Sequence, residues 1–141
     1  QELHFDALLQ HAAPRCTGDV LFKRMLTGRA RSVFRGMIDV GREAQQTDAY
    51  LQSRTLLLDG YPRADTIPEL EIKADNVKCS HGATTGEVDP EAVFYLCSRG
   101  LDKPTARRMI VDGFTDEIVQ RFGAEKSAPR AALRRALGDE E

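Results

Sequence analysis

The sequence has few cysteines, no long apolar run and no excess of charge of one sign. Its three cysteines, Cys16, Cys79 and Cys97, form no Cys-x-x-Cys pair, which argues against a disulfide framework and against a self-contained zinc site. A reducing compartment is the natural interpretation. No stretch approaches the ~20 apolar residues of a membrane-spanning helix. The first ten residues also lack the basic and apolar regions of a signal peptide.

The charges nearly cancel, with 20 basic and 22 acidic residues and a net charge of −2. This balance offers no overall electrostatic basis for binding nucleic acid or a membrane surface. A length of 141 residues suffices for one domain or for a domain with a small appendage. Because the first residue is Gln1 rather than Met, we expect a fragment or a processed chain.

Strand and turn patterns occupy the chain up to Gly86. Apolar residues there alternate or come in short runs, at 31–40, 56–58 and 70–77, with glycines and Asp-Gly or Asp-Asn pairs between them. Roughly five short strands fit, with no helix between them. Parallel strands in a β-solenoid and antiparallel hairpins in an incomplete sandwich account for this pattern equally well. The glycine-rich residues 82–86 predict a turn that links a strand to a helix.

Helical patterns follow Gly86. Asp89 is placed to cap a helix with Pro90 at its first position, and Gly100 is placed to stop it. A second helix begins at Asp102, with Ala106, Met109, Ile110, Gly113 and Phe114 on one face, and Thr115 is placed to cap a third, short helix. Residues 123–128 predict a linker before a short basic helix that starts at Pro129. A run of strands followed by a run of helices predicts segregated β and α parts, which we place at residues 1–86 and 87–141.

The sharpest local feature is Cys79-Ser80-His81. On a strand, the first and third residues point to the same side, about 7 Å apart, and thiolate and imidazole both bind borderline metals. Two ligands do not complete a tetrahedral site, so the pattern predicts half a site at an interface. The competing interpretation is that Cys79 is a small core residue.

Other reactive side chains have ordinary interpretations. Cys97 lies on an apolar helix face and is expected to be structural. Glu69 and Glu71 share a strand face and could form an acid–base pair, but Lys73 on that face favours a solvated charged surface. No set of nucleophile, base and orienting group emerges, which argues against an enzyme.

From Gly36 to Phe122 the sequence resembles the SufB/SufD family of the SUF iron–sulfur cluster assembly system. SufD-type chains carry the Cys-Ser-His-Gly-Ala-Thr stretch found at 79–84, whereas SufB usually has a His-Glu-Ala-Thr form. SufB also carries a cysteine where Ser53 aligns, which makes this chain a poor independent scaffold. The segments that resemble the family, in the family's order, are residues 34–36, 51–58, 68–72, 77–84, 94–100 and 110–114.

The resemblance implies a mainly β fold with a helical end, namely a right-handed parallel β-helix, truncated here, followed by a small carboxy-terminal helical domain. It implies a non-catalytic subunit that pairs with a SufB-like subunit through the β-helices and docks the SufC ATPase through the helices. His81 and Cys79 then form a half-site that the partner completes. Iron or an iron–sulfur cluster would be held there transiently, with no stable cluster on the isolated chain.

Docking of SufC is expected at Tyr95, Arg99 and Phe114, and the chain could pair with itself when SufB is missing. The expected location is the cytoplasm, or the plastid stroma in a plant. Two other functions remain open: a carbohydrate-processing enzyme built on a β-helix, and a purely structural homodimer module.

Overall fold

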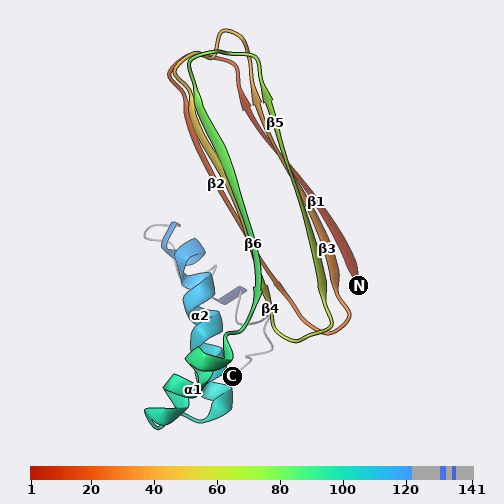
Figure 1. The fold of residues 1–141 in the computed structure, drawn as a ribbon, viewed down its shortest axis with the longest axis vertical. Helices are drawn as coiled ribbons and strands as arrows, with labels where there is room; N and C mark the ends of the chain where they lie inside the picture. The colour runs from red at the N-terminus through yellow and green to blue at the C-terminus, as the bar shows by residue number, and fades with distance from the viewer. Residues whose placement is uncertain (122–130, 133–134, 136–141) are drawn as a thin grey trace. The chain divides into compact units, whose positions relative to one another are not determined.

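The structure is a computed structural model that describes residues 1–121, 131–132 and 135 (Figure 1). The chain forms two compact units, Gln1–Glu87 and Val88–Glu141. The sequence placed this boundary one residue earlier, after Gly86. The predicted linker at 123–128 and most of the basic helix from Pro129 lie outside the described residues.

The first unit contains six strands of ten residues each. They are β1 (Glu2–His11), β2 (Thr17–Leu26), β3 (Arg31–Val40), β4 (Asp48–Leu57), β5 (Arg63–Ile72) and β6 (Lys78–Glu87). The prediction of a strand at 31–40 is confirmed by β3. The prediction of roughly five short strands is wrong, because residues before Arg31 form two further strands and every strand is long.

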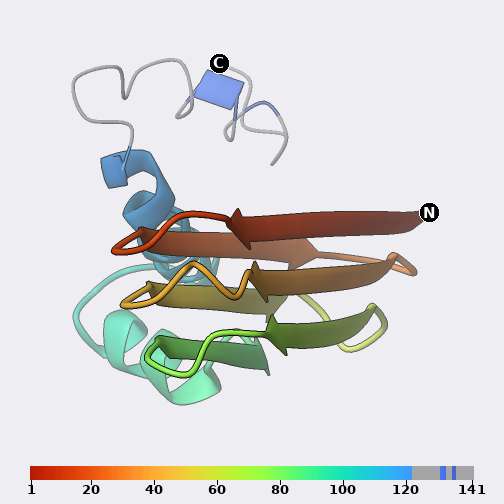
Figure 2. The same cartoon turned by 90° about the horizontal axis from the view of Figure 1, so that it is seen from above.

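The six strands form two parallel three-stranded sheets, ordered β1-β3-β5 and β2-β4-β6. Consecutive strands therefore alternate between the sheets, and each of β1 to β4 pairs in register with the strand two positions later in the chain. Figure 2 shows the resulting stack of three layers, each made of one strand from either sheet. The hairpin alternative is wrong for the described residues, since all six strands pair in parallel.

The turns at one end of the strands stack as the strands do. The amide of Arg15 donates to the carbonyl of Gln45 at 2.8 Å, and the amide of Gln46 donates to the carbonyl of Asn76 at 2.6 Å. Arg15 and Gln46 both have a positive φ, 59° and 61°. These bonds satisfy backbone groups that a bend would otherwise leave unpaired, so successive layers are tied together at their turns.

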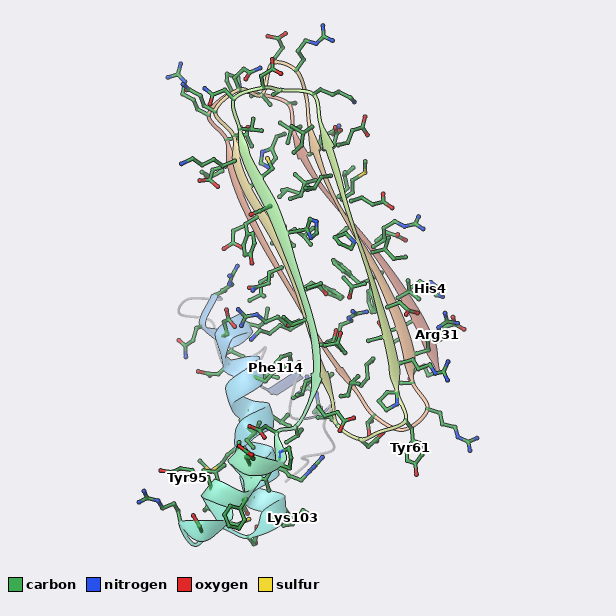
Figure 3. The ribbon with its side chains drawn as sticks, in the orientation of Figure 1. His4, Arg31, Tyr61, Tyr95, Lys103 and Phe114 are labelled. Atoms are coloured by element: carbon green, nitrogen blue, oxygen red, sulfur yellow. The ribbon has the colours of Figure 1, made fainter. Side chains whose placement is uncertain are left out.

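The space between the sheets holds the core of the first unit (Figure 3). Burial in β3 follows a period of two, as expected when one face of a strand points inward. Phe34, Ile38 and Val40 from one sheet meet Ala49 and Leu51 from the other, and all five are at most 1% exposed. Alternate residues of β3 and β4 thus point into an apolar interior.

One interior side chain is charged. Arg24 on β2 is 5% exposed, and its guanidinium donates to oxygens of Ser32, Thr55, Asp65 and Thr66 over 2.6–3.2 Å. These acceptors lie on or beside β3, β4 and β5, so Arg24 reaches from the first layer to the third. Burial lowers the pKa of its guanidinium below the usual value, and the charge of Asp65 partly offsets this.

The second unit contains helices α1 (Pro90–Ser98) and α2 (Lys103–Arg121). The predicted caps are present: Asp89 Oδ1 accepts from the amide of Glu91 at 2.9 Å, and Asp102 Oδ1 accepts from the amide of Thr105 at 2.8 Å. The prediction of a separate helix from Thr115 is wrong, because α2 continues to Arg121.

The predicted apolar face of α2 is only partly correct. Ala106 is buried, but Met109 is 50% exposed and Gly113 is exposed. The remaining buried positions of the helix are Val111, Thr115 and Val119. The stripe of buried residues continues past Thr115, as expected for one long helix. The sequence had instead predicted two short helices in this region.

Candidate functional site

The segment that carries Cys79 and His81 is a strand over its whole length. β6 runs from Lys78 to Glu87 and pairs with β4 throughout. The predicted turn at 82–86 is therefore wrong, and His81 does not lie at a strand end. Pairing with β4 supplies hydrogen bonds that outweigh the poor strand propensity of Gly82 and Gly86.

Cys79 and His81 point to the interior side of their sheet. Cys79 is the register partner of Ala49, and His81 is the register partner of Leu51. Both β4 residues are 1% exposed in the core, and partners in register point to the same face of a sheet. Their spacing places the two donors about 7 Å apart along β6. The Cys79 and His81 side chains therefore point to the same side of β6, as the sequence predicted.

The interior is open to solvent at this third layer. Leu70 and Ile72 on β5 are register partners of the fully buried Ile38 and Val40, yet each remains 40% exposed. His81 is also exposed, and Cys79 is half-buried. We call Leu70, Ile72, Cys79 and His81 the end cluster. Interior-facing apolar side chains at the free edge of two sheets are typical of a surface that another chain covers.

The thiol in the end cluster is less acidic than a free cysteine. Burial raises the pKa of Cys79, and the nearby charge of Asp48 raises it further, whereas a hydrogen bond with the backbone of Ala49 opposes both. The thiolate is the metal-binding form. Cys79 is therefore protonated at neutral pH in the isolated chain, and a metal would have to displace its proton.

The donor set fits half a metal site. Within residues 1–121 and the few described beyond them, no group of three or more His, Cys, Asp or Glu side chains is placed to hold a metal ion. Tetrahedral sites for iron or zinc use four ligands. The thiol and the imidazole suit soft and borderline metals, but two further ligands would have to come from another molecule.

Ser53 on β4 faces the same interior. It is fully buried, and its Oγ has no hydrogen-bond partner within the described part of the chain. Its register partner on β6 is Ala83, which follows His81 on the interior side. A hydroxyl at this position is a weak metal ligand, so Ser53 adds no soft donor to the end cluster.

The two carboxylates considered for acid–base chemistry are in surface ion pairs. Glu69 Oε1 lies 3.6 Å from Arg35 Nε, and Glu71 Oε1 lies 2.7 Å from Lys73 Nζ. The hydrogen bond from Lys73 to Glu71 raises the pKa of the lysine. The structure thus has the charged outer face that the presence of Lys73 predicted.

A second candidate surface lies on α1. Tyr95 is 57% exposed, and its hydroxyl accepts a hydrogen bond of 3.1 Å from Arg99 Nη2. The guanidinium carbon also lies 5.2 Å from the centre of the tyrosine ring. Figure 3 shows Tyr95 projecting from α1. Tyr95 and Arg99 therefore form one exposed feature, whereas Phe114 on α2 is half-buried and separate from that contact.

The same unit has a groove that the sequence did not reveal. It has a volume of about 350 Å³. Phe94 is 75% exposed at this groove, and Val93 forms part of its buried floor. The groove depends on how α1 and α2 pack, which helical spacing in the sequence does not reveal. The sequence therefore indicated only a structural role for Cys97. Its lining residues are Val88, Pro90, Val93, Phe94, Cys97, Lys103 and Arg107.

Comparison with known proteins places the whole first unit in one family. The family described as "SUF system FeS cluster assembly, SufBD core domain" matches residues 1–114. The chain belongs to the SufBD family. The resemblance was clear from residue 36 in the sequence, and the match extends it to the first residue.

Its relatives include SufD and SufBD proteins. The chain is 41% identical over 112 residues to the iron-sulfur cluster assembly protein SufD of Escherichia coli, covering 79% of this chain and 26% of that protein. It is 41% identical over 121 residues to a SufBD family protein of Synechocystis, covering 86% and 26%. It is 38% identical over 122 residues to protein ABCI7, chloroplastic, of Arabidopsis thaliana, covering 86% and 25%. The chain is thus SufD-like.

The chain spans about a quarter of the length of these three relatives. Among the described residues, no helix is both long and apolar enough to cross a bilayer. Family membership therefore connects the chain to SUF iron–sulfur cluster assembly, while its own contribution has to be inferred from the end cluster and the helical surface.

Proposed function

We propose that this chain is a non-catalytic scaffold subunit of the SUF complex, which pairs with a SufB-like subunit and docks the SufC ATPase. The observation that carries the proposal is the end cluster. It presents Cys79 and His81 beside exposed apolar side chains at the free edges of β5 and β6. Such a surface offers both a contact area and an incomplete ligand set, which suits assembly work shared between two chains.

The fold proposed for the whole protein is a right-handed parallel β-helix followed by a helical domain. Two observations support it: strands alternate between two parallel sheets, and successive layers stack in register. Because each layer buries its interior side chains against the next, the third layer needs a covering chain. A SufB-like β-helix with a similar open end would supply that cover.

The cargo of the joint site is iron or an iron–sulfur cluster. Cys79 and His81 supply two donors, and the SufB-like chain supplies the rest. The raised pKa of the Cys79 thiol makes its ligation dependent on displacement of a proton. The exposed imidazole of His81 is more accessible to a metal than the half-buried thiol. We therefore assign the leading role to His81 and a secondary role to Cys79, with transient binding in the complex and no stable cluster on the isolated chain.

Docking of SufC is assigned to the helical unit. Tyr95 and Arg99 form an exposed aromatic–cation pair, a combination common among residues that dominate interface energies. The groove beside Phe94 adds apolar area and two cations, Lys103 and Arg107. Phe114 is half-buried, so its contribution is to support the helices rather than to make the main contact.

We further propose that the complex works in the cytoplasm or, for a plant protein, in the plastid stroma, and that this chain pairs with itself when SufB is missing. Self-pairing follows from the same open end, because the free edges of β5 and β6 can meet a second copy as well as a partner.

The test is reconstitution of the full-length protein with its SufB-like and SufC-like partners. We expect the three proteins to co-purify and the complex to acquire a cluster that is detected by absorption and electron paramagnetic resonance. A complex that forms without this protein and loads an equal amount of cluster would contradict the scaffold role. Turnover of a glycan by the purified protein would instead favour the carbohydrate-processing alternative.

A further inference from the structure

We propose that Tyr50 is a positioning residue, which clamps the edge strand β6 at Gly82 and so fixes the backbone that carries His81. The inference rests on the proposed function for its effect on cluster assembly, but the clamp itself can be measured on the protein alone.

The basis for the clamp is a close steric contact above Gly82. A Cβ atom added to Gly82 would lie 2.9 Å from the hydroxyl oxygen of Tyr50 and 3.8 Å from its Cζ. The hydroxyl end of the Tyr50 side chain therefore lies over the backbone of β6. Tyr50 reaches this place diagonally, because its own register partner is Ser80 while Gly82 pairs with Gln52. A side chain at position 82 would force the ring away.

β6 has little else to hold it in place. It pairs with β4 along one edge only. Along its ten residues only Cys79 and Gly82 are shielded to an intermediate degree, and the others are exposed. Cys79 packs inward against the core, and Gly82 is covered from the outside by Tyr50. His81 lies between these two shielded positions, so its backbone is held from both faces of the sheet.

A glycine in an edge strand weakens the strand unless a neighbour compensates for the missing side chain. An aromatic ring packed over such a glycine is a recognised compensation. Gly86 provides the comparison within the same strand. It points to the same face as Gly82, but a Cβ there would meet nothing within 4 Å. The contact with Tyr50 is therefore specific to the position next to His81.

Placement of His81 matters because ligands must be held within about 0.5 Å of the productive geometry. Residues that orient a metal ligand without touching the metal typically change affinity or activity by about 10–100-fold when they are removed. Tyr50 lies on the outer face of the sheet while His81 points to the interior, so Tyr50 acts through the β6 backbone rather than on the cargo.

The first experiment measures hydrogen exchange of β6 amides in the full-length protein. Tyr50→Ala is expected to accelerate exchange at residues 80–83 several-fold, with no change in β3. Tyr50→Phe keeps Cζ but loses the hydroxyl nearest to Gly82, so its exchange is expected to fall between those of the parent and Tyr50→Ala. Tyr61→Ala is the matched control, because Tyr61 is 78% exposed. Equal exchange in the Tyr50→Ala and Tyr61→Ala proteins would overturn the clamp.

The second variant pair tests the same contact from the glycine. Gly82→Ala is expected to accelerate exchange in β6, and Gly86→Ala is not. Combined with Tyr50→Ala, the change at Gly82 should add nothing further, since its steric partner is gone. Fully additive effects of Gly82→Ala and Tyr50→Ala would overturn the proposed contact.

The functional arm uses the complex reconstituted with the SufB-like and SufC-like proteins. At equal amounts of assembled complex, Tyr50→Ala is expected to lower cluster loading by about tenfold, with partial restoration by Tyr50→Phe. Accelerated β6 exchange with normal loading would refute the positioning role while leaving the scaffold function intact. Loading that is also unaffected by His81→Ala would instead refute the proposed site.

Discussion

Arg24 provides the sharpest test of what holds the layers of the first unit together. Its buried guanidinium lies between the two sheets and donates to four residues of other strands or their flanks. Arg24→Met keeps a long side chain of similar reach, so it removes the charge and the donors without opening a large cavity. The change therefore isolates the polar contacts.

Two opposing terms set the magnitude. Loss of the donors leaves the carbonyls of Ser32 and Asp65 without this partner, at about 1–3 kcal/mol each, while the hydroxyls of Thr55 and Thr66 can rotate toward other acceptors. Removal of a buried cation recovers part of its desolvation cost. We expect a net loss of about 3 kcal/mol in the free energy of unfolding.

The assay is urea-induced unfolding, followed by circular dichroism, of the Arg24→Met protein and its parent. The slope of the free energy of unfolding against urea concentration should stay constant, while the urea concentration at the midpoint falls. Arg35→Ala is the matched control, because Arg35 is exposed and its pair with Glu69 spans 3.6 Å, for which at most about 1 kcal/mol is expected. A loss for Arg24→Met no larger than that of the control would refute the tie between layers.

Three further outcomes concern the proposed sites. His81→Ala should abolish cluster loading of the complex while changing the free energy of unfolding by no more than ~0.5 kcal/mol, as for the exposed His4→Ala control; a large stability loss with normal loading would make His81 structural. Tyr95→Ala combined with Arg99→Ala should weaken SufC binding by calorimetry and leave SufB pairing intact, and equal loss of both partners would count against separate surfaces. Because burial raises the pKa of the Cys79 thiol, Fe²⁺ affinity of the complex should rise as pH increases toward the thiol pKa, and Cys79→Ser should flatten that rise; an unaltered profile would remove Cys79 from the site.

Local signals were sufficient for the ends of the helices. Asp89 and Pro90 act within one turn of the chain, and the structure has the cap and the first helical position where the sequence put them. The first two strands were missed although a signal was present. Leu3, Phe5 and Ala7 alternate with polar residues, the period of two expected for a strand with one buried face.

Non-local contacts explain what the sequence could not reveal. Residues 82–86 read as a turn because two glycines flank small polar residues. The partners that make them a strand lie some thirty residues earlier in β4. The contact of Tyr50 with Gly82 has the same origin, and so does the choice between parallel and antiparallel pairing. Propensity describes neighbours in the chain, whereas the registers of two stacked sheets are set by distant segments.

The end cluster combines two properties that depend on each other. A complete metal site inside the first unit would need donors in the core, where Ile38, Val40 and Leu51 instead form an apolar cluster. At the third layer the interior face is still shaped by that core but is open to solvent, so a thiol and an imidazole can be accommodated there without full burial. The same openness leaves the ligand set incomplete. Under the proposed function, a partner that covers Leu70 and Ile72 also meets Cys79 and His81, so we expect pairing and completion of the site to be one event.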